Sequence, residues 1–264
     1  MNTQYGKVFS DIKNGFFDWR MWGRLGWQET VRRYRRTTIG PFWTTLSLGI
    51  FVTTLGLVWA QLWKQDPKTY LLFLTAGMLA WGLFQSIVTE GCLVFTGASA
   101  LITSMQISYT TLACAVVWRN VLVLFHNMII LVIVMLYTGS SVTWYSLLAI
   151  PGLLLISING VWLGLLFGAI CTRFRDTQQI IASILQVSMF VTPIFWSPEQ
   201  LGSRRNAFVN YNVLYHFVDI LRAPLLGKAP GDLSYYVVLG ATVIGWALTI
   251  FVLSRFRRRI PYWL

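Results

Sequence analysis

Long runs without a charged side chain constrain this chain more than any other feature. Residues 37–63, 69–89 and 120–172 contain no Asp, Glu, Lys or Arg. A helix of about 20 apolar residues crosses the hydrocarbon core of a bilayer, and a charge placed there is costly. The whole chain is 56% hydrophobic and 11% charged, whereas soluble domains average about 25% charged residues. The sequence therefore predicts an all-α membrane protein that crosses the bilayer several times.

The charge-free runs and the turn signals between them predict six transmembrane helices. We place them at about 40–62, at 70–93, as two crossings between 119 and 173, at 177–196, and at 233–254. Residues 95–109 are rich in small and hydroxyl side chains, which favours a short helix and turn at one membrane face. Residues 213–226 are apolar but too short to cross and return as two helices. A re-entrant element is predicted there, because irregular backbone at membrane depth must lie against protein or a water-filled cavity.

The distribution of Lys and Arg predicts the orientation of these helices. Of the 21 basic residues, 15 fall on the side that carries both termini, and six fall on the other side. Cytoplasmic loops are enriched in Lys and Arg, so both termini are expected in the cytoplasm. This topology explains most of the net charge of +12 without nucleic-acid binding. One dense cluster is Arg32, Arg33, Arg35 and Arg36, directly before the first predicted span, where Pro41 suits the first helical turn.

Residues 1–30 predict an amphipathic helix rather than a span, followed by a transmembrane domain over residues 31–264. Phe9, Ile12, Phe16 and Trp19 recur at intervals of three and four, which gives one apolar helical face. Such a helix lies in the membrane interface, or packs as a solvated helix on a partner protein. No continuous apolar core of a cleavable signal peptide is present in this segment.

One helical face of the fourth predicted span carries glycine at every fourth position. Gly160, Gly164 and Gly168 form two overlapping GxxxG repeats. In lipid, such a face lets two helix backbones approach closely. The pattern predicts a packing surface, either within one subunit or between two subunits.

The residue patterns of common enzyme sites are missing from the sequence. Two Gly-Lys pairs lack the remainder of a phosphate-binding loop, no HExxH motif occurs, and the three cysteines have no metal-ligand spacing. Glu90 is the one acidic residue within a predicted span, which argues against an ion-coupled transporter or a membrane-embedded glycan-modifying enzyme. Energy for transport is therefore expected from a separate ATPase subunit.

Four motifs, in order along nearly the whole chain, resemble those of one transporter family. They are Arg32–Arg36 with Gly40 and Trp43, the loop Arg173–Asp176, the segment Thr192–Pro198, and the segment Asn212–Arg222. Together they resemble the transmembrane subunit of ABC-2-type exporters of lipid-linked polysaccharide, namely the O-antigen, capsule and teichoic acid permeases. Val213 departs from the pattern, because the family usually has proline there. Residues 96–110 also lack the basic residues common in the family.

The resemblance implies a homodimer in the inner membrane, joined by two ATP-binding cassette subunits that hold ATP and Mg²⁺. This chain would contact membrane lipids and a lipid-linked polysaccharide and would carry no cofactor or metal. The family docks its ATPases through the elements that correspond here to Gly97–Tyr109 and Arg173–Gln179. The coupling residues implied are Ser99, Ile102, Ser104, Arg173, Arg175 and Asp176. Membrane flanking by the two arginines and N-capping by Asp176 are the alternative roles.

Aromatic residues are the candidates for a substrate channel, since rings can guide a sugar chain along its C–H faces. The candidates are Trp43, Phe51, Trp59, Trp81, Phe84, Phe190, Phe195 and Trp196. Lipid-facing or core positions are the alternative for each ring. An outer gate is predicted from Tyr215, His216, Asp219 and Arg222, where Asp219 and Arg222 could instead pair structurally. An ABC-2 exporter of drugs or lipids is the nearest alternative function.

Overall fold

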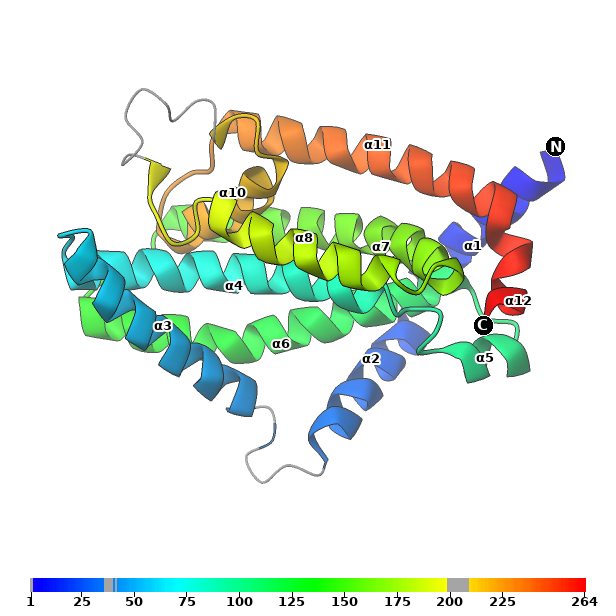
Figure 1. Cartoon of the computed structure of the whole chain (residues 1–264), viewed down its shortest axis with the longest axis horizontal. Coiled ribbons are helices and arrows are strands. Elements are labelled where there is room, and N and C mark those ends of the chain that lie inside the picture. The colour runs from blue at the N-terminus through cyan, green and yellow to red at the C-terminus, as the bar shows by residue number, and fades with distance from the viewer. Residues whose placement is uncertain (1, 36–39, 41, 199–208) are drawn as a thin grey trace.

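The computed structural model describes residues 2–35, 40, 42–198 and 209–264, and this part of the chain contains helices but no β-strand. Four long helices lie side by side along the long axis of the molecule (Figure 1). They are α4 (Pro67–Gly91), α6 (Tyr109–Thr138), α7 (Ala149–Arg173) and α11 (Asp232–Phe256). Both chain termini lie at the same end of this bundle, which we call the termini end, and the opposite end is the far end (Figure 1).

Shorter and oblique helices surround the four long ones. At the far end lie the start of α4 and α10 (Val213–Leu225), and α5 (Ser99–Ser104) lies at the termini end (Figure 1). Helix α3 (Phe42–Leu62) packs obliquely on α4 and α6. The 3₁₀ turn η1 (Trp144–Leu148) precedes α7, and η3 (Arg257–Arg259) with α12 (Ile260–Trp263) follows α11.

Five of the described helical segments are long and apolar enough to cross a membrane, which confirms the prediction of an all-α, multi-pass protein. They are α3, α4, α6, η1 with α7, and α11 with its continuation. The predicted fifth span is different. Helix α8 (Thr177–Val191) has 15 residues, about 22 Å at 1.5 Å per residue, which is less than the core thickness of about 30 Å. It ends before Pro193, which cannot continue a helix, rather than at Trp196.

Some predicted boundaries move, and some predicted residues lie outside the described part of the chain. Helix α6 begins at Tyr109 rather than near Arg119, because neutral residues precede that arginine and continue the helix. The residues of our predictions that fall outside the described ranges are Arg36, Pro41 and the basic pair at 204 and 205.

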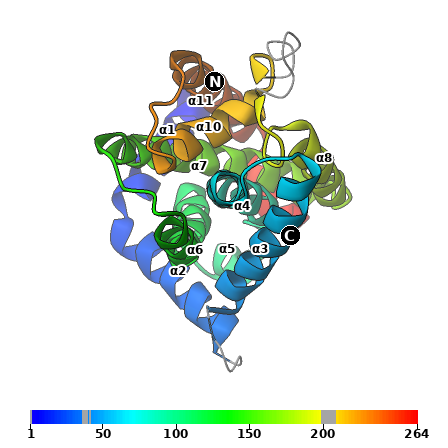
Figure 2. The same ribbon diagram turned by 90° about the vertical axis from the view of Figure 1, so that its left-hand side faces the viewer.

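Helix α4 is the central helix of the bundle. It packs against α3, α6, α7 and α10 (Figure 2). Leu74, Ala80 and Trp81 on α4 are fully buried. Burial of most of its surface explains why α4 is largely apolar between its ends.

The small-residue face of α7 packs inside the subunit, which decides between the two alternatives left by the sequence. A Cβ atom added to Gly91 of α4 would lie 2.9 Å from the Cα atom of Gly164. A Cβ atom added to Gly160 would lie 2.7 Å from Ile87 of α4. These glycines therefore let the α4 and α7 backbones touch.

The N-terminal segment folds as two helices rather than as the single helix predicted. Helix α1 (Asn2–Phe17) and helix α2 (Trp19–Tyr34) are separated at Asp18, which has a non-helical ψ of 51°. Both pack along α6, and α1 also contacts α11 (Figure 2).

The face of α1 that packs on the bundle is not the predicted apolar face. Val8, Asp11 and Gly15 are buried against the bundle, whereas Phe9 and Phe16 are exposed. Gly15 is required at this contact, because a Cβ atom there would lie 2.4 Å from Thr110. The bundle thus takes the small and polar face of α1, which leaves Phe9 exposed and Phe16 partly exposed beside Trp246 of α11.

Candidate functional site

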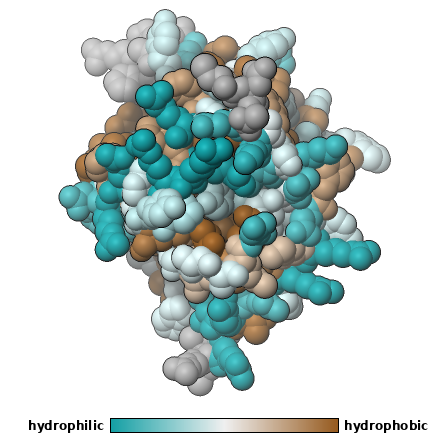
Figure 3. Space-filling model, turned by 90° about the vertical axis from the view of Figure 1, so that its right-hand side faces the viewer, coloured by the Kyte–Doolittle hydropathy of each residue, from teal (hydrophilic) through white to brown (hydrophobic). Residues whose placement is uncertain are grey.

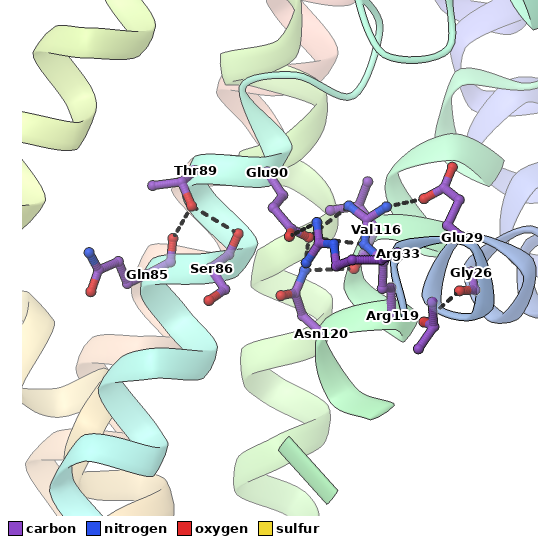
Figure 4. A network of polar contacts seen from close by, with 11 residues as sticks. Gly26, Glu29, Arg33, Gln85, Ser86, Thr89, Glu90, Val116, Arg119 and Asn120 are labelled. Carbon is purple, nitrogen blue, oxygen red and sulfur yellow. Dashed lines mark hydrogen bonds and ion pairs between the residues drawn. The ribbon is translucent and has the colours of Figure 1, made fainter. Parts of the chain in front are cut away.

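A group of charged side chains joins three helices near the termini end. Glu90 in the last turn of α4 accepts a hydrogen bond from Arg33 Nη2 of α2 at 2.7 Å and from Arg119 Nη2 of α6 at 2.7 Å. Asn120 Nδ2 donates to the same carboxylate at 2.7 Å, and Arg119 also pairs with Glu29 of α2. Figure 4 shows these side chains converging on Glu90. The side chains of Glu90 and Arg119 are 18% and 13% exposed, so the pair is largely removed from water.

This network holds α2 against the bundle. Burial alone would lower the pKa of Arg33, but the hydrogen bond from Arg33 to Glu90 and the carboxylate charge raise the pKa above its ordinary value. Arg33 therefore stays charged at any physiological pH. Because Arg33 and Arg119 both donate hydrogen bonds to the Glu90 carboxylate, Glu90 has a structural role at the junction of α2, α4 and α6.

A second carboxylate, on Asp11 of α1, caps the start of α6 and is 5% exposed. It accepts hydrogen bonds from the backbone N–H groups of Tyr109 at 3.2 Å and Thr110 at 3.1 Å, and from the Thr110 hydroxyl at 3.0 Å. Arg257 Nη2 of η3 donates to the same carboxylate at 2.7 Å. The first N–H groups of a helix lack partners within the helix, and a negative charge is favourable there. Asp11 therefore joins the N-terminal helix, the start of α6 and the C-terminal segment.

Two of the predicted coupling residues meet at the termini end although they are far apart in the sequence. Ser99 of α5 and Arg175, in the turn before α8, line one pocket of about 320 Å³ together with Gln178 and Leu264. Figure 3 views this end of the molecule, where hydrophilic side chains surround smaller apolar patches. Helix α5 is followed along the chain by α6, whose first residues bind Asp11.

The other four predicted coupling residues differ in their surroundings. Ile102 is half-buried against the core, and Ser104 is exposed and donates to a carbonyl of its own helix at 2.6 Å. The Arg173 guanidinium lies over two aromatic rings, each with its centroid at 5.2 Å. Asp176 is exposed at the N-cap position of α8, but its side chain makes no capping hydrogen bond. The carboxylate of Asp176 is therefore available at the surface.

At the far end, Arg222 of α10 is held by a carbonyl and two rings. Arg222 is 3% exposed and donates a hydrogen bond from Nη1 to the carbonyl of Pro193. Its guanidinium lies 4.8 Å from the ring centroid of Phe73 and 5.5 Å from that of Tyr215. The predicted pairing with Asp219 is present, with 4.0 Å between Arg222 Nη2 and Asp219 Oδ1. Arg222 therefore ties α10 to α4 and to the turn after α8.

The other predicted gate residues tie α10 to the start of α11. The Ser234 hydroxyl donates to Asp219 at 2.7 Å, and the Gly231 N–H donates to it at 3.3 Å. His216 Nδ1 lies 3.0 Å from the same serine hydroxyl. Tyr215, Asp219 and Arg222 also line a pocket of about 460 Å³ at this end.

Asn212 explains how α10 begins without the proline usual in the resembled family. The Asn212 side-chain oxygen accepts a hydrogen bond from the Tyr215 N–H at 3.2 Å, which caps the helix. Its Nδ2 donates to the Thr192 hydroxyl at 3.2 Å. Val213 therefore begins a regular helix.

The eight aromatic residues predicted for a channel fall into two groups. Trp81, Phe84 and Phe195 pack inside the subunit, with 0%, 5% and 4% exposure. The remaining rings are exposed or half-buried, and they are Trp43, Phe51, Trp59, Phe190 and Trp196. A role in lining a channel stays a prediction for these rings.

Two functional candidates in the structure were not singled out from the sequence. Asp11 and Glu29 lie in the polar pattern of the N-terminal segment, and their partners are 98 and 90 residues away along the chain. The small residue Gly15, one turn beyond Asp11, was the available signal, because it marks a face on which another helix can pack closely.

Comparison with known proteins agrees with this architecture. The family model of the ABC-2 type transporter matches residues 21–226. The chain is also 24% identical over 233 residues to the O-antigen export system permease protein RfbA of Myxococcus xanthus. That alignment covers 86% of this chain and 89% of the relative. The matched region contains α3 to α10 and all the predicted coupling and gate residues, and the chain therefore belongs to the ABC-2 type transporter family.

Proposed function

We propose that this chain is the transmembrane subunit of an ATP-driven exporter that moves lipid-linked polysaccharide out across the inner membrane. It works as a homodimer with two ATP-binding cassette subunits, which hold ATP and Mg²⁺. The observation that carries the substrate class is the similarity, over most of both chains, to a permease named for O-antigen export. Membership of the ABC-2 type family supports the partnership with a separate ATPase.

The distribution of basic residues supports a cytoplasmic position for the termini end. Arg255 lies in the last turn of α11, the arginines of η3 follow it, and Arg173 and Arg175 flank the end of α7. Positive residues are retained on the cytoplasmic side of a membrane. With the termini end in the cytoplasm, α5 and the turn at Arg175 face the ATPase subunits.

The shared pocket of Ser99 and Arg175 supports a single docking surface. An ATPase element seated there would contact α5 and the turn before α8 together. Movement of α5 would reach α6 directly along the chain and would reach α1 through Asp11. The surface is thus connected to both α6 and α1.

The short helix α8 supports a substrate pathway on the side of α3 and α8. Its exposed residues include Phe190, and α3 carries the exposed rings Trp43 and Phe51. The turn at Thr192–Trp196 lies at the end of a helix too short to span the bilayer, so its backbone must face protein or water rather than lipid. A second copy of the chain opposite these helices would enclose such a pathway.

A deletion and complementation experiment tests this function. In cells that lack the chain, lipid-linked polysaccharide should accumulate inside and be lost from the cell surface, and re-expression should restore it. Restored drug resistance or phospholipid transport without any change in polysaccharide would contradict the proposed substrate.

A further inference from the structure

A pocket of about 500 Å³ between the ends of α7 and α11 has the composition of a lipid site. Its floor is apolar and comes from both helices, with Ile170 and Val252 half-buried. Arg173, Arg255 and Arg259 lie around it. The pocket is separate from the one that contains Ser99 and Arg175.

The arginines at this pocket carry positive charge that no described carboxylate neutralises. None of the ion pairs within residues 2–35, 40, 42–198 and 209–264 involves Arg173, Arg255 or Arg259. Arg257, from the same short segment, is different, because it is paired with the buried carboxylate of Asp11 at 2.7 Å. Within the segment, the charge of Arg257 is thus neutralised, whereas Arg255 and Arg259 keep their charge at the pocket.

Aromatic packing fixes the position of Arg173 at this pocket. The guanidinium lies 5.2 Å from the ring centroid of Phe174 and 5.2 Å from that of Trp263, and both rings line the pocket. Stacking leaves the N–H groups at the guanidinium edge free to bind a planar or tetrahedral oxyanion. An ordinary flanking arginine would have no such preset position.

We propose that this pocket binds an anionic glycerophospholipid of the surrounding membrane. The phosphate group would lie among Arg173, Arg255 and Arg259, and an acyl chain would lie along the apolar floor formed by α7 and α11. The match of charge and apolar surface favours a lipid over a free phosphate, since basic pockets at the cytoplasmic ends of membrane helices suit anionic headgroups. The inference rests on the cytoplasmic orientation of the termini end but not on the exported substrate.

The binding is measured on the full-length purified chain in nanodiscs or detergent, without the ATPase and without polysaccharide. Dioleoyl phosphatidylglycerol is the probe, and dioleoyl phosphatidylcholine is the zwitterionic comparison, with bound lipid counted by native mass spectrometry. The variants are R259Q and the double variant R255Q/R259Q. The matched control is R258Q, which removes the same charge from an exposed neighbour that does not line the pocket.

We expect R259Q to lower the affinity for phosphatidylglycerol about 5-fold, since each arginine near an anionic headgroup contributes a factor of about five. The double variant should lower the affinity about 30-fold, because the two factors multiply. R258Q should stay within about 2-fold of the unmodified chain on the same scale. An equal loss in R258Q, or no loss in the double variant, would overturn the site. Equal binding of phosphatidylcholine, or displacement of the lipid by millimolar glycerol 3-phosphate, would overturn the assignment to an anionic lipid. These outcomes do not depend on transport, so failure here leaves the export function to its own test.

Discussion

Replacing Glu90 with Gln tests whether the charged network fastens α2 to the bundle. Glu90 accepts four hydrogen bonds, from Arg33 at 2.7 Å, from Arg119 at 3.1 and 2.7 Å, and from Asn120 at 2.7 Å. The amide of Glu90→Gln keeps the shape but carries no charge, and it leaves two arginines facing a neutral group. Removing one partner of a buried pair costs about 3–5 kcal/mol. Because Glu90 is 18% exposed at its side chain, we expect a smaller loss of unfolding free energy, about 2–3 kcal/mol.

The measurement is unfolding of the purified chain in mixed micelles by SDS titration, followed by circular dichroism. Glu29→Gln is the matched control, because it removes a carboxylate that is 30% exposed and whose one ion-pair partner among the described residues is Arg119. We expect that control to cost less than about 1 kcal/mol. The double variant Glu90→Gln/Arg119→Gln should lose about 1–2 kcal/mol less unfolding free energy than the two single variants lose when added together. Equal losses for Glu90→Gln and Glu29→Gln, or strict additivity with Arg119→Gln, would refute the reasoning.

Three further substitutions test other parts of the structure. Asp11→Ala should lower stability by about 2–4 kcal/mol, measured by thermal unfolding, because it removes the α6 cap and leaves Arg257 without its buried partner. Asp18→Ala should change stability little, because Asp18 makes no capping hydrogen bond. Gly91→Ala should lower the unfolding free energy by about 1–3 kcal/mol, because the new methyl would meet the backbone of Gly164 at 2.9 Å. Its control is Gly82→Ala on the same helix, which has open space and should be neutral or stabilising. Equal effects of the two substitutions would contradict the close packing of α4 and α7. Arg222→Lys should cost about 1–2 kcal/mol despite the retained charge, because lysine cannot stack on Phe73 and bind the Pro193 carbonyl together, and an unchanged melting temperature would argue against this anchoring.

The sequence predicted those parts of the fold that depend on local composition. The charge-free runs placed α3, α4 and α11 within three residues of their observed ends. Helix α8 was overextended because proline, and not charge, sets its end. The break at Asp18 was missed because the apolar spacing of the N-terminal segment continues through it.

The candidate site was less predictable, because it is built from contacts between distant segments. The sequence placed Ser99 and Arg175 among the coupling candidates, and the structure brings both to one pocket. It placed Glu90 near a membrane helix but could not identify Arg33, Arg119 and Asn120 as its partners. Asp11 could not be predicted as a cap for α6, because no feature of the neighbouring sequence indicates a partner 98 residues away.

The most direct test of the account is ATP turnover by the complete transporter in proteoliposomes. The chain would be purified together with the ATP-binding cassette subunit expected to accompany it and reconstituted with or without lipid-linked polysaccharide extracted from the host. We predict a stable complex whose ATP turnover changes when the polysaccharide is added and whose response weakens with Arg175→Ala. A complex that responds to drugs or simple phospholipids but not to polysaccharide would contradict the proposed substrate, and the failure to form any complex would contradict the partnership with the ATPase.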